Sequence, residues 1–412
     1  MSIHSRNIPL FTIIMICLIF SCSEKKQGNK VFSPITNPDI AVIDIDNAEL
    51  REKMLFSSVL DTPEVIILET KKNCIIRNIR SIDLYEGNYY ILDDQSNALY
   101  VFSNSGKYIQ SIGHQGNGHG EYLEISDFSI DRQKGELYLW DEAMDKALKY
   151  DLKTGDYISS TQTERNGERS FCMQFYNGHL YVNRTCLDDD GTKYLLKEID
   201  TSNGTQIAAH LDADKYNKGW NYPLRFPFTY FYAKNSESPK YIEMFSDTIV
   251  SLTPNGIIPS YVIKSKDFVT KEDITQLKRT FKDPYDYNLE PLRKMQRISH
   301  ISRYADFKDA VYLEYEKGDE HYYLIYNEKK KKATISSSFV DDYISNNMNI
   351  PVKICYSDKQ GILAYIMPNH IPHFIKHIVK EGLLEEDIDK YEQIKQIEED
   401  SNPILFYHKF LK

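Results

Sequence analysis

The sequence has too few cysteines, too widely spaced, to form a metal cluster or a disulfide framework. Six cysteines occur in 412 residues, and two of them, Cys17 and Cys22, lie near the N-terminus. No pair has the CxxC spacing of a zinc or redox site, so we expect neither a metal nor a cofactor. Among the other four, Cys172 and Cys186 are the only close pair, and a hairpin between them would place them out of register. We therefore expect buried free thiols at Cys74, Cys172, Cys186 and Cys355.

Positive charge is also scarce, and the local motifs of well-known enzyme classes are missing. The 50 Lys and Arg residues are outnumbered by 60 Asp and Glu, which gives a net charge of −10. This balance disfavours a nucleic-acid partner, because phosphate backbones select basic surfaces. The sequence contains no GxSxG, GxGxxG or GxxxxGK[ST] pattern. It therefore carries no local signature of catalysis.

Only one long apolar run exists, at the N-terminal end. Residues 8–20 are almost wholly apolar and follow Arg6. This run is too short to span a bilayer but suits the apolar region of a signal peptide. The next residues, Ser21-Cys22, resemble the end of a bacterial lipobox, in which the cysteine is acylated and becomes the mature N-terminus. A short membrane anchor and an ordinary signal peptide with an incidental cysteine are the alternatives.

The N-terminal pattern also predicts the domain boundaries and the cellular address. We expect a signal peptide over 1–21, a lipidated Cys22 with a flexible polar tether over 22–40, and a folded domain over 41–412. The protein would then be attached by its lipid to the cell envelope, most simply in the outer membrane. The sequence leaves open whether the protein faces the periplasm or the cell exterior.

The most informative residues that are present belong to an internal repeat. Gly87–Asp93, Gly135–Asp141 and Gly178–Asn183 each begin with glycine and continue as a short apolar run with aromatic residues. The three glycines are spaced by 48 and 43 residues. Tyrosine is abundant, with 31 copies against 2 tryptophans, and it favours pleated, half-buried surfaces. Each copy therefore predicts a strand entered through a tight turn.

A second landmark follows each copy of the first. Ser105-Gly106 matches Thr154-Gly155, and Asn203-Gly204 is a weaker third copy, with glycines 49 residues apart in both steps. Glycine supplies the positive φ that tight hairpin turns require. A unit of about 45–50 residues with several strands has the size of a β-propeller blade.

Strands assigned with this template predict an all-β, six-bladed β-propeller of four-stranded antiparallel blades. The sixth blade lacks a fourth strand at the C-terminal end, whereas residues 64–69 form an unassigned strand near the N-terminus. We expect 64–69 to pair beside 403–410 and to close the ring. The predicted blades cover residues 75–113, 124–162, 170–211, 227–264, 301–339 and 351–410.

Two segments have the spacing of amphipathic helices rather than strands. Residues 270–299 and 374–399 carry apolar residues three and four apart within charged sequence. Asp283-Pro284 is expected to interrupt the first segment. We interpret both as helical insertions, in blades 5 and 6.

The run from Gly113 to Tyr122, followed by Asp127-Phe128, resembles the six-bladed β-propeller lipoproteins of Bacteroidetes, which are loosely related to NHL- and TolB-type propellers. His119 stands where that family usually has proline. The likeness extends to the segment from Asp247 to Val250 and to that from Asn402 to Leu405. It implies the fold and the envelope location, and it implies no biochemical role.

Two groups of residues are candidates for ligand binding. Trp220 and Tyr222 precede a predicted strand and could contact a ligand at the rim, although neighbouring aromatics are more typical of blade packing. His114, His119 and Glu121 lie on the glycine-rich run and could meet near the channel mouth. The alternative is that both histidines are exposed and Glu121 binds turn amides. The spacing matches no recognised metal site.

Three functions remain open, and the sequence leaves catalysis undecided. The first is a binding module for a glycan, a peptide or a partner protein, and the second is a lyase, lactonase or hydrolase with an axial active site. The third is a structural component of an outer-membrane complex, with contacts made by the helical insertions. Several axial acids and histidines in mutual reach would favour the enzyme, whereas an exposed apolar stripe on the insertions would favour assembly.

Overall fold

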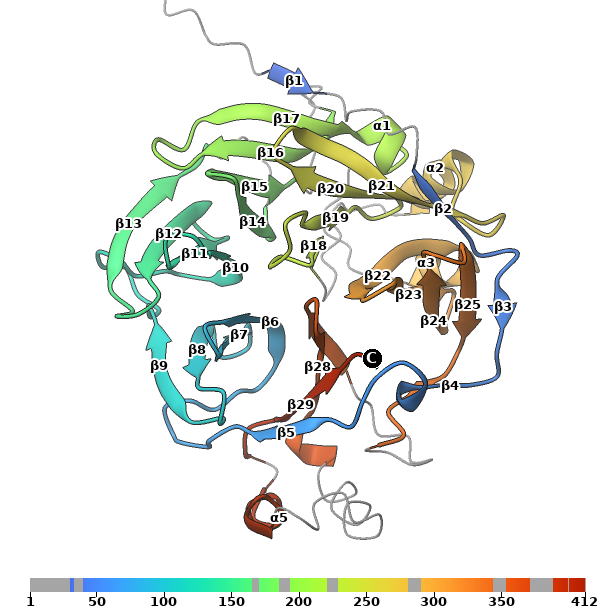
Figure 1. The fold of residues 1–412 in the computed structure, drawn as a ribbon. Coiled ribbons are helices and arrows are strands. Elements are labelled where there is room, and N and C mark those ends of the chain that lie inside the picture. Colours follow the sequence, from blue (N-terminus) through green and yellow to red (C-terminus); the bar gives the residue numbers. More distant parts are fainter. Residues whose placement is uncertain are drawn as a thin grey trace, which may run out of the picture.

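Six separate β-sheets form a ring about a central axis, as the repeats predict (Figure 1). The computed structural model describes residues 30–32, 40–164, 170–184, 193–220, 229–280, 290–343, 353–370, 388–398 and 400–411. Each sheet is one blade with four antiparallel strands, and the first strand of each blade lies nearest the axis. No strand ladder joins one blade to the next among these residues, so side-chain packing holds neighbouring blades together.

The strands of the first three blades follow the predicted order. Blade 1 contains β6 (Ile79–Tyr85), β7 (Asn88–Asp93), β8 (Ala98–Phe102) and β9 (Tyr108–Ile112). Blade 2 contains β10 (Ile125–Asp131), β11 (Glu136–Asp141), β12 (Lys146–Asp151) and β13 (Tyr157–Gln162). Blade 3 contains β14 (Met173–Tyr176), β15 (His179–Asn183), β16 (Tyr194–Asp200) and β17 (Gln206–Asp212).

Blades 4 to 6 complete the ring. Blade 4 contains β18 (Phe231–Tyr232), β19 (Lys240–Ile242), β20 (Thr248–Thr253) and β21 (Gly256–Lys264). Blade 5 contains β22 (Ile298–Phe307), β23 (Ala310–Lys317), β24 (Glu320–Asn327) and β25 (Lys332–Ser336). Blade 6 contains β27 (Lys353–Ser357), β28 (Gly361–Ile366), β29 (Ile404–Lys409) and β5 (Glu64–Ile67).

Blade 6 is built from both ends of the chain, and the predicted pairing of 64–69 with 403–410 is confirmed. β5 pairs antiparallel with β29, with Ile67 opposite Ile404. The buried Asn402 amide strengthens this junction, since its Nδ2 donates to the carbonyls of Glu69 and Cys74, both at 2.8 Å. Its Oδ1 accepts from the amide of Ile76 at 2.7 Å. The ring is thus joined inside one blade rather than by a continuous ladder around the axis.

Before it reaches blade 6, the N-terminal segment wraps the outside of three other blades. We call residues 30–55 the strap. Its strands β1 (Lys30–Phe32), β2 (Ala41–Asp44) and β3 (Glu49–Leu50) pair in parallel with β17, β21 and β25. β4 (Met54–Leu55) then pairs with β26 (Phe339–Val340), and a short 3-10 turn, η1 (Phe56–Ser58), follows. Lys30–Phe32 falls within the predicted tether, and the rest of 22–39 lies outside the described residues.

The two sequence repeats have distinct structural roles. The last residue of the first repeat accepts hydrogen bonds from the chain that enters the same blade. Asp93 accepts from the amides of Arg77 and Asn78, and Asp141 does the same for Leu123 and Glu124. In blade 3 the Asn183 Oδ1 atom binds the amides of Phe171 and Cys172. These side chains satisfy backbone donors that no ladder would pair.

The glycine of the second repeat lies where one blade meets the outer strand of the blade before it. Gly106 and Gly204 have φ of +79° and +76°. A Cβ atom at Gly106 would lie 2.1 Å from the Ile67 carbonyl oxygen, and one at Gly204 would lie 1.8 Å from that of Gln162. The glycine is therefore required by close backbone approach between blades as well as by turn conformation.

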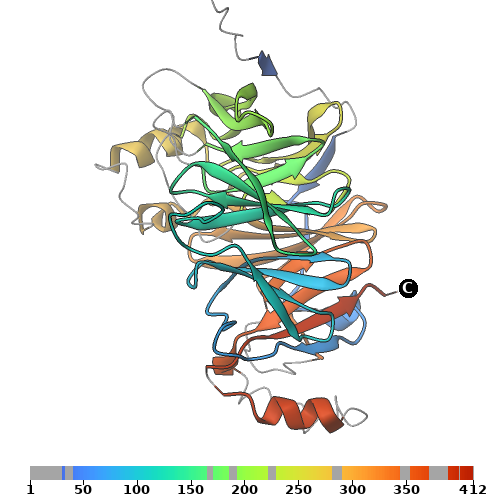
Figure 2. The ribbon, with the colours of Figure 1, turned by 90° about the vertical axis from the view of Figure 1, so that its left-hand side faces the viewer.

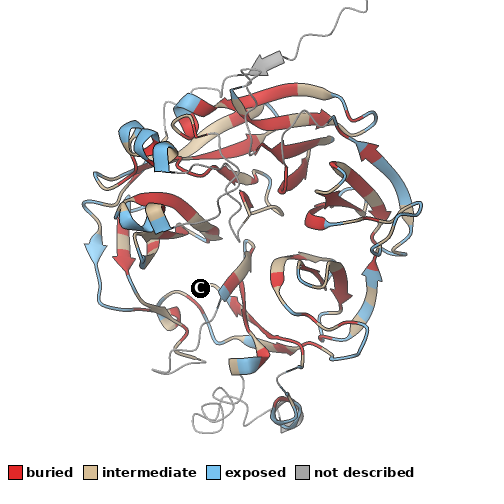
Figure 3. Cartoon of the chain, turned by 180° about the vertical axis from the view of Figure 1, so that it is seen from behind, coloured by how far each residue is buried: buried red, intermediate tan, exposed pale blue. Residues whose placement is uncertain are grey.

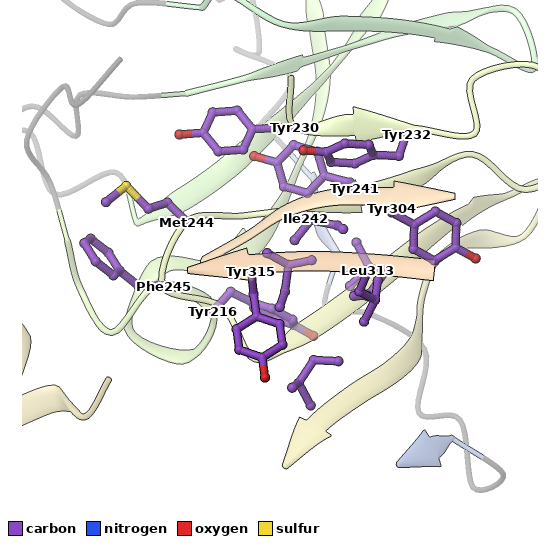
Figure 4. Close-up of a cluster of buried hydrophobic side chains, with 14 of the residues drawn as sticks. Tyr216, Tyr230, Tyr232, Tyr241, Ile242, Met244, Phe245, Tyr304, Leu313 and Tyr315 are labelled. Carbon is purple, nitrogen blue, oxygen red and sulfur yellow. The ribbon is translucent and has the colours of Figure 1, made fainter. Parts of the chain in front are cut away.

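The hydrophobic core lies between the blades. Its largest cluster spans blades 3 to 5 and is rich in tyrosine, with Tyr230, Tyr232, Tyr241 and Tyr304 among its buried members (Figure 4). Buried positions follow the strands that face neighbouring blades, whereas exposed positions collect on the rim and in connections (Figure 3). The tyrosine excess is thus largely core packing.

The two faces of the ring differ. The insertion face carries the connections between blades and those between the second and third strands of a blade, and the hairpin face carries the other turns. Figure 2 shows α2 (Lys271–Thr280) and α3 (Glu290–Lys294) on one side of the ring, whereas α5 (Ile388–Lys395) lies beyond its edge, next to the outer strand β5. The same face has α1 (Ala213–Tyr216) and η2 (Pro368–His370). The helical insertions are confirmed in their described parts; residues 281–289 and 371–387 lie outside them.

Candidate functional site

One turn of blade 4 crosses the hairpin-face end of the central axis. We call residues 233–239 the axial turn. Its Lys234 Nζ lies 2.6 Å from Asp127 Oδ1 and donates to the carbonyls of Phe128 and Met173, both at 3.0 Å. The Lys234 side chain is 15% exposed and that of Asp127 3%. This ion pair joins blade 4 to blade 2 across the axis, because blade 3 separates the two blades along the ring.

The axial turn also reaches blade 6, which is not its neighbour either. Asn235 Nδ2 donates to the Tyr356 hydroxyl at 2.8 Å and to the Ser357 carbonyl at 3.2 Å. The Tyr176 hydroxyl of blade 3 donates to the Glu237 carbonyl at 2.9 Å. Contacts with blades 2, 3 and 6 therefore hold the axial turn across this end of the ring.

The acidic side chains near the axis are paired with cations. Arg132 binds both the Asp83 carboxylate and the Leu84 carbonyl. Burial raises the pKa of Asp83, and the charge of Arg132 offsets part of that effect. Such a pair joins blades 1 and 2 and leaves no unsatisfied carboxylate at this point.

A second polar cluster lies in blade 5. Arg303 Nε is 3.1 Å from Glu314 Oε1, and His321 Nε2 is 3.2 Å from Glu314 Oε2. Burial alone would raise the pKa of Glu314, but Arg303 and hydrogen bonds from His321 and Tyr312 hold it below its usual value. Burial alone would lower the pKa of His321, yet bonds to Glu314 and Glu316 raise it to about 9. His321 is therefore a cation at neutral pH.

A pocket of about 630 Å³ opens on the insertion face where blade 6 meets blade 1. We call it the seam pocket. Among the described residues, three basic side chains, Arg77, Lys353 and His370, line it, together with one acidic residue, Asp400. The rest of the lining is mainly apolar, with Tyr365 as its only aromatic member: Ile75, Ile76, Met367, Pro368 and Tyr365, with Gln95, Asn369 and Ser401.

The wall of the seam pocket is positioned by the ring closure. The Ile76 amide is held by Asn402, and the Arg77 amide donates to Asp93 Oδ2 at 2.7 Å. Lys353 begins β27, the innermost strand of blade 6. The pocket is therefore built on backbone whose hydrogen bonds are already made, which is what a precise binding site needs.

The predicted residues on the glycine-rich run form a local structure. Glu121 accepts from the Gly118 amide at 2.6 Å and lies 2.7 Å from His114 Nε2, and the His114 side chain is 74% exposed. The Gly118 amide and His114 hold the pKa of Glu121 below its usual value. His119 is exposed and contacts the Tyr157 ring edge-on. The interpretation of exposed histidines with Glu121 bound to a turn amide is confirmed.

Trp220 does not present a ring to a ligand. It is 4% exposed and packs edge-on against Phe245 at a centroid distance of 5.2 Å. The prediction of a rim contact at Trp220 is therefore wrong, because the apolar indole is more stable in the core between blades. Tyr222 and Cys22 lie outside the described residues.

Metal and thiol chemistry find no support in the part of the chain that the structure describes. No group of three or more His, Cys, Asp or Glu side chains there could hold a metal ion. Cys74, Cys172 and Cys355 are free thiols, and burial raises the pKa of Cys172 to about 11. Free thiols are thus confirmed at these three positions, and Cys186 lies outside the described residues.

Sequence reasoning missed the residues of the seam pocket and the axial turn. Arg77, Lys353 and His370 come from three distant parts of the chain, so no local spacing joins them. Lys234 is the last residue of the predicted inner strand of blade 4, and it belongs to no motif. The predicted ring closure could have located the pocket. If 64–69 pairs with 403–410, the residues that follow 69 and those that precede 403 must lie close together, and both groups line the pocket.

Residues 40–409 match the domain of unknown function DUF4934, which accounts for most of the chain. The chain belongs to the DUF4934 family. This DUF4934 protein is similar in structure to a Bacteroides fragilis protein assigned as exported, with 19% identity and a TM-score of 0.70. The match covers 90% of this chain and all of that chain, and it supports the fold alone.

A member of the DUF4221 family from Bacteroides vulgatus is a weaker neighbour, at 10% identity and a TM-score of 0.49 over 86% of this chain and 98% of that one. No curated protein matches the sequence. Among the described helices, none is long and apolar enough to cross a bilayer. The six-bladed propeller expected from the family resemblance is confirmed, and the lipid anchor and the NHL- or TolB-type relationship stay predictions.

Proposed function

We propose that this DUF4934 protein is an exported, lipid-anchored binding module of the cell envelope that takes its ligand in the seam pocket. The observation that carries this proposal is the contrast between the two ends of the ring. The axial turn crosses the hairpin-face end, whereas the insertion face has a pocket of about 630 Å³ with three basic side chains. Pockets of this size on rigid scaffolds are the usual sites for small ligands or peptide segments.

The chemistry of the lining favours an acidic peptide segment as the ligand. Arg77 and Lys353 supply positive charge and His370 supplies a ring N–H donor, which together suit a carboxylate. Ile75, Ile76 and Met367 supply an apolar surface for a side chain. Glycan sites rely on aromatic platforms. Among the described residues that line the pocket, Tyr365 alone has such a ring, which favours a peptide over a sugar.

Binding fits the described residues better than catalysis does. Asp83 and Asp127, on the innermost strands of blades 1 and 2, and Glu314, on the second strand of blade 5, are each paired with a cation from another strand or blade. A carboxylate held this way stabilises the ring and is poorly placed to transfer protons to a substrate.

A role in assembly through the helical insertions has less support. α2 buries its apolar residues Ile274 and Leu277, and it exposes charged and polar positions. Ile394 of α5 is likewise buried. An assembly surface would need an exposed apolar stripe, and the described parts of these helices lack one.

The envelope location rests on the N-terminal sequence. The apolar run 8–20 followed by Ser21-Cys22 supports export and acylation at Cys22. A Cys22→Ala variant should lose incorporation of labelled palmitate and leave the membrane fraction, while a Cys74→Ala variant should keep both. Unchanged membrane attachment of Cys22→Ala would contradict the anchor.

The binding proposal is tested with peptide and glycan arrays that compare wild type with Arg77→Ala and Lys353→Ala. We expect acidic peptides to bind, with affinity reduced at least about tenfold by either substitution and by raised salt. Lys329→Ala is the control, because Lys329 is 73% exposed at a hairpin-face turn. Binding confined to glycans, or acidic-peptide binding that both pocket variants retain, would reject the proposal.

A further inference from the structure

The outer edges of the blades differ in whether a further strand covers them. Blades 3, 4 and 5 each gain a fifth strand from the strap, in parallel with β17, β21 and β25. Within the described residues, blades 1 and 2 end at β9 and β13 without a fifth strand. Figure 1 shows β9 and β13 next to each other on the rim, upstream of the arc that the strap covers.

The absence of a fifth strand changes how much of the outer strand meets solvent. β17, which is covered by β1, has no exposed residue, whereas β13 exposes Ile158, Ser159, Ser160 and Gln162. Ile109 on β9 is 47% exposed and Ile158 on β13 is 45% exposed. Blades 1 and 2 therefore present apolar side chains where blade 3 is covered.

Neither open edge has the usual protection against strand pairing. The sequences of β9 and β13, YIQSI and YISSTQ, contain no charged residue and no proline. Exposed edge strands are normally blunted by charges, proline or covering elements, because their free backbone groups pair readily with another strand. Blade 6, by contrast, has Glu64 in its outer strand.

The two edges continue the path of the strap. The turn between the third and fourth strands of a blade lies against the outer strand of the preceding blade. Gly155 of blade 2 thus lies at Gln110 of blade 1, and Gly204 of blade 3 lies at Gln162 of blade 2. The outer strands therefore follow one another around the rim. A segment that pairs in parallel with β9 and then β13 would end where β1 begins on blade 3, so it would extend an interface that this fold already uses three times.

We propose that β9 and β13 bind an extended, largely uncharged segment of another polypeptide, which adds a parallel fifth strand to blades 1 and 2. Backbone pairing would supply affinity, and contacts with Ile109 and Ile158 would select apolar residues. A bilayer is a poorer occupant, because lipid cannot satisfy the backbone groups of an open edge.

This chain itself is a poor source of that strand. Seven residues separate Cys22 from Lys30, and they include Glu24, Lys25 and Lys26 and no apolar residue. By comparison, the link between β1 and β2, residues 33–40, contains eight residues and connects only two neighbouring blades. With processing at Cys22, which is part of the proposed function, the occupant of both blades must come from another molecule.

Residue-resolved hydrogen exchange of the full lipoprotein tests this inference. We expect amides of β9 and β13 to exchange at least about tenfold more slowly in isolated native membranes than in detergent. The slowing should affect every second residue, because only alternate amides of an edge strand point outward. An Ile109→Lys/Ile158→Lys double variant should lose it, while Val42→Lys, altered at an exposed strap position, should keep it.

Three results would overturn the inference. Equal exchange in membranes and detergent would mean that no strand is added. Equal slowing in vesicles of pure phospholipid would assign the edge to the bilayer, and slowing already complete in detergent would assign it to the chain's own residues. Acidic-peptide binding to the double variant, measured on the array, reports on the seam pocket separately, so the two proposals can fail independently.

Discussion

At the scale of single residues, the repeats mark places where one blade must meet the next. Asp93, Asp141 and Asn183 hold the amides of the entering chain, and Gly106 and Gly204 let backbones approach across a blade boundary. The sequence shows that these residues recur at blade spacing. Their partners could not be predicted, because each hydrogen bond or close approach joins residues whose meeting depends on the finished ring.

Glycine substitutions should separate backbone conformation from blade packing. Gly106→Ala and Gly87→Ala both place alanine at φ near +78°, which costs about 1–2 kcal/mol. Only Gly106→Ala also pushes a Cβ against the Ile67 carbonyl, whereas the space around Gly87 is open within 4 Å. We expect Gly106→Ala to lower the free energy of unfolding clearly more than Gly87→Ala in urea denaturation.

Gly155 provides an internal check on this explanation. A Cβ there would meet the flexible Gln110 side chain at 2.8 Å, which can move, rather than a carbonyl. Gly155→Ala should therefore resemble Gly87→Ala. If all three alanine variants lose the same stability, blade contact does not explain the repeat.

At the scale of elements, the strands of blades 1 to 3, the fifth blade and the shared sixth blade follow the sequence pattern closely. Their hydrophobic runs and turn glycines are local signals. The strap was missed, because β2 and β3 are edge strands of four and two residues that only an existing sheet can order. Blade 4 is also less regular than predicted: β18 has two residues, and residues 221–228 lie outside the described chain.

The strap should be part of the folded core rather than a removable tail. Ile43 on β2 is fully buried, whereas its neighbour Val42 is 48% exposed. Ile43→Ala should destabilise the protein by about 2–5 kcal/mol, as expected for a large buried side chain. Val42→Ala should change stability by less than about 0.5 kcal/mol. Equal, small effects in chemical denaturation would show that β2 is only loosely attached.

At the scale of the whole molecule, the protein is a ring whose two faces differ in structure. The axial turn, through Lys234 and Asn235, ties blade 4 to the non-neighbouring blades 2 and 6 on one face. On the other face the seam pocket opens between blades 6 and 1. The ring and its closure could be predicted from sequence, because repeats and an orphan strand are local patterns. The pocket could not, since its basic residues converge only when the ring closes.

The blade 5 ion cluster should appear in the pH dependence of unfolding. The folded protein keeps a proton on His321 up to about pH 9, whereas an unfolded histidine releases it near 6.5. The resulting stabilisation is complete below pH 6.5 and is lost as the pH rises to 9. The melting-temperature difference between wild type and His321→Gln should therefore shrink over this range.

The exposed His114→Gln variant is the control for this pH series, since His114 is 74% exposed and its pair with Glu121 is local. Its melting-temperature difference from wild type should stay small across the same range. A His321→Gln difference that is constant from pH 6.5 to 9 would show that the charge of His321 does not stabilise the ring.

The most direct test of the central claim is a crystal structure of the protein with an acidic peptide selected on the array. We expect peptide density in the seam pocket, with a carboxylate within hydrogen-bonding distance of Arg77 or Lys353 and an apolar side chain against Ile76 and Met367. Density on the hairpin face, at the axial turn, or at the rim with an empty seam pocket would contradict it.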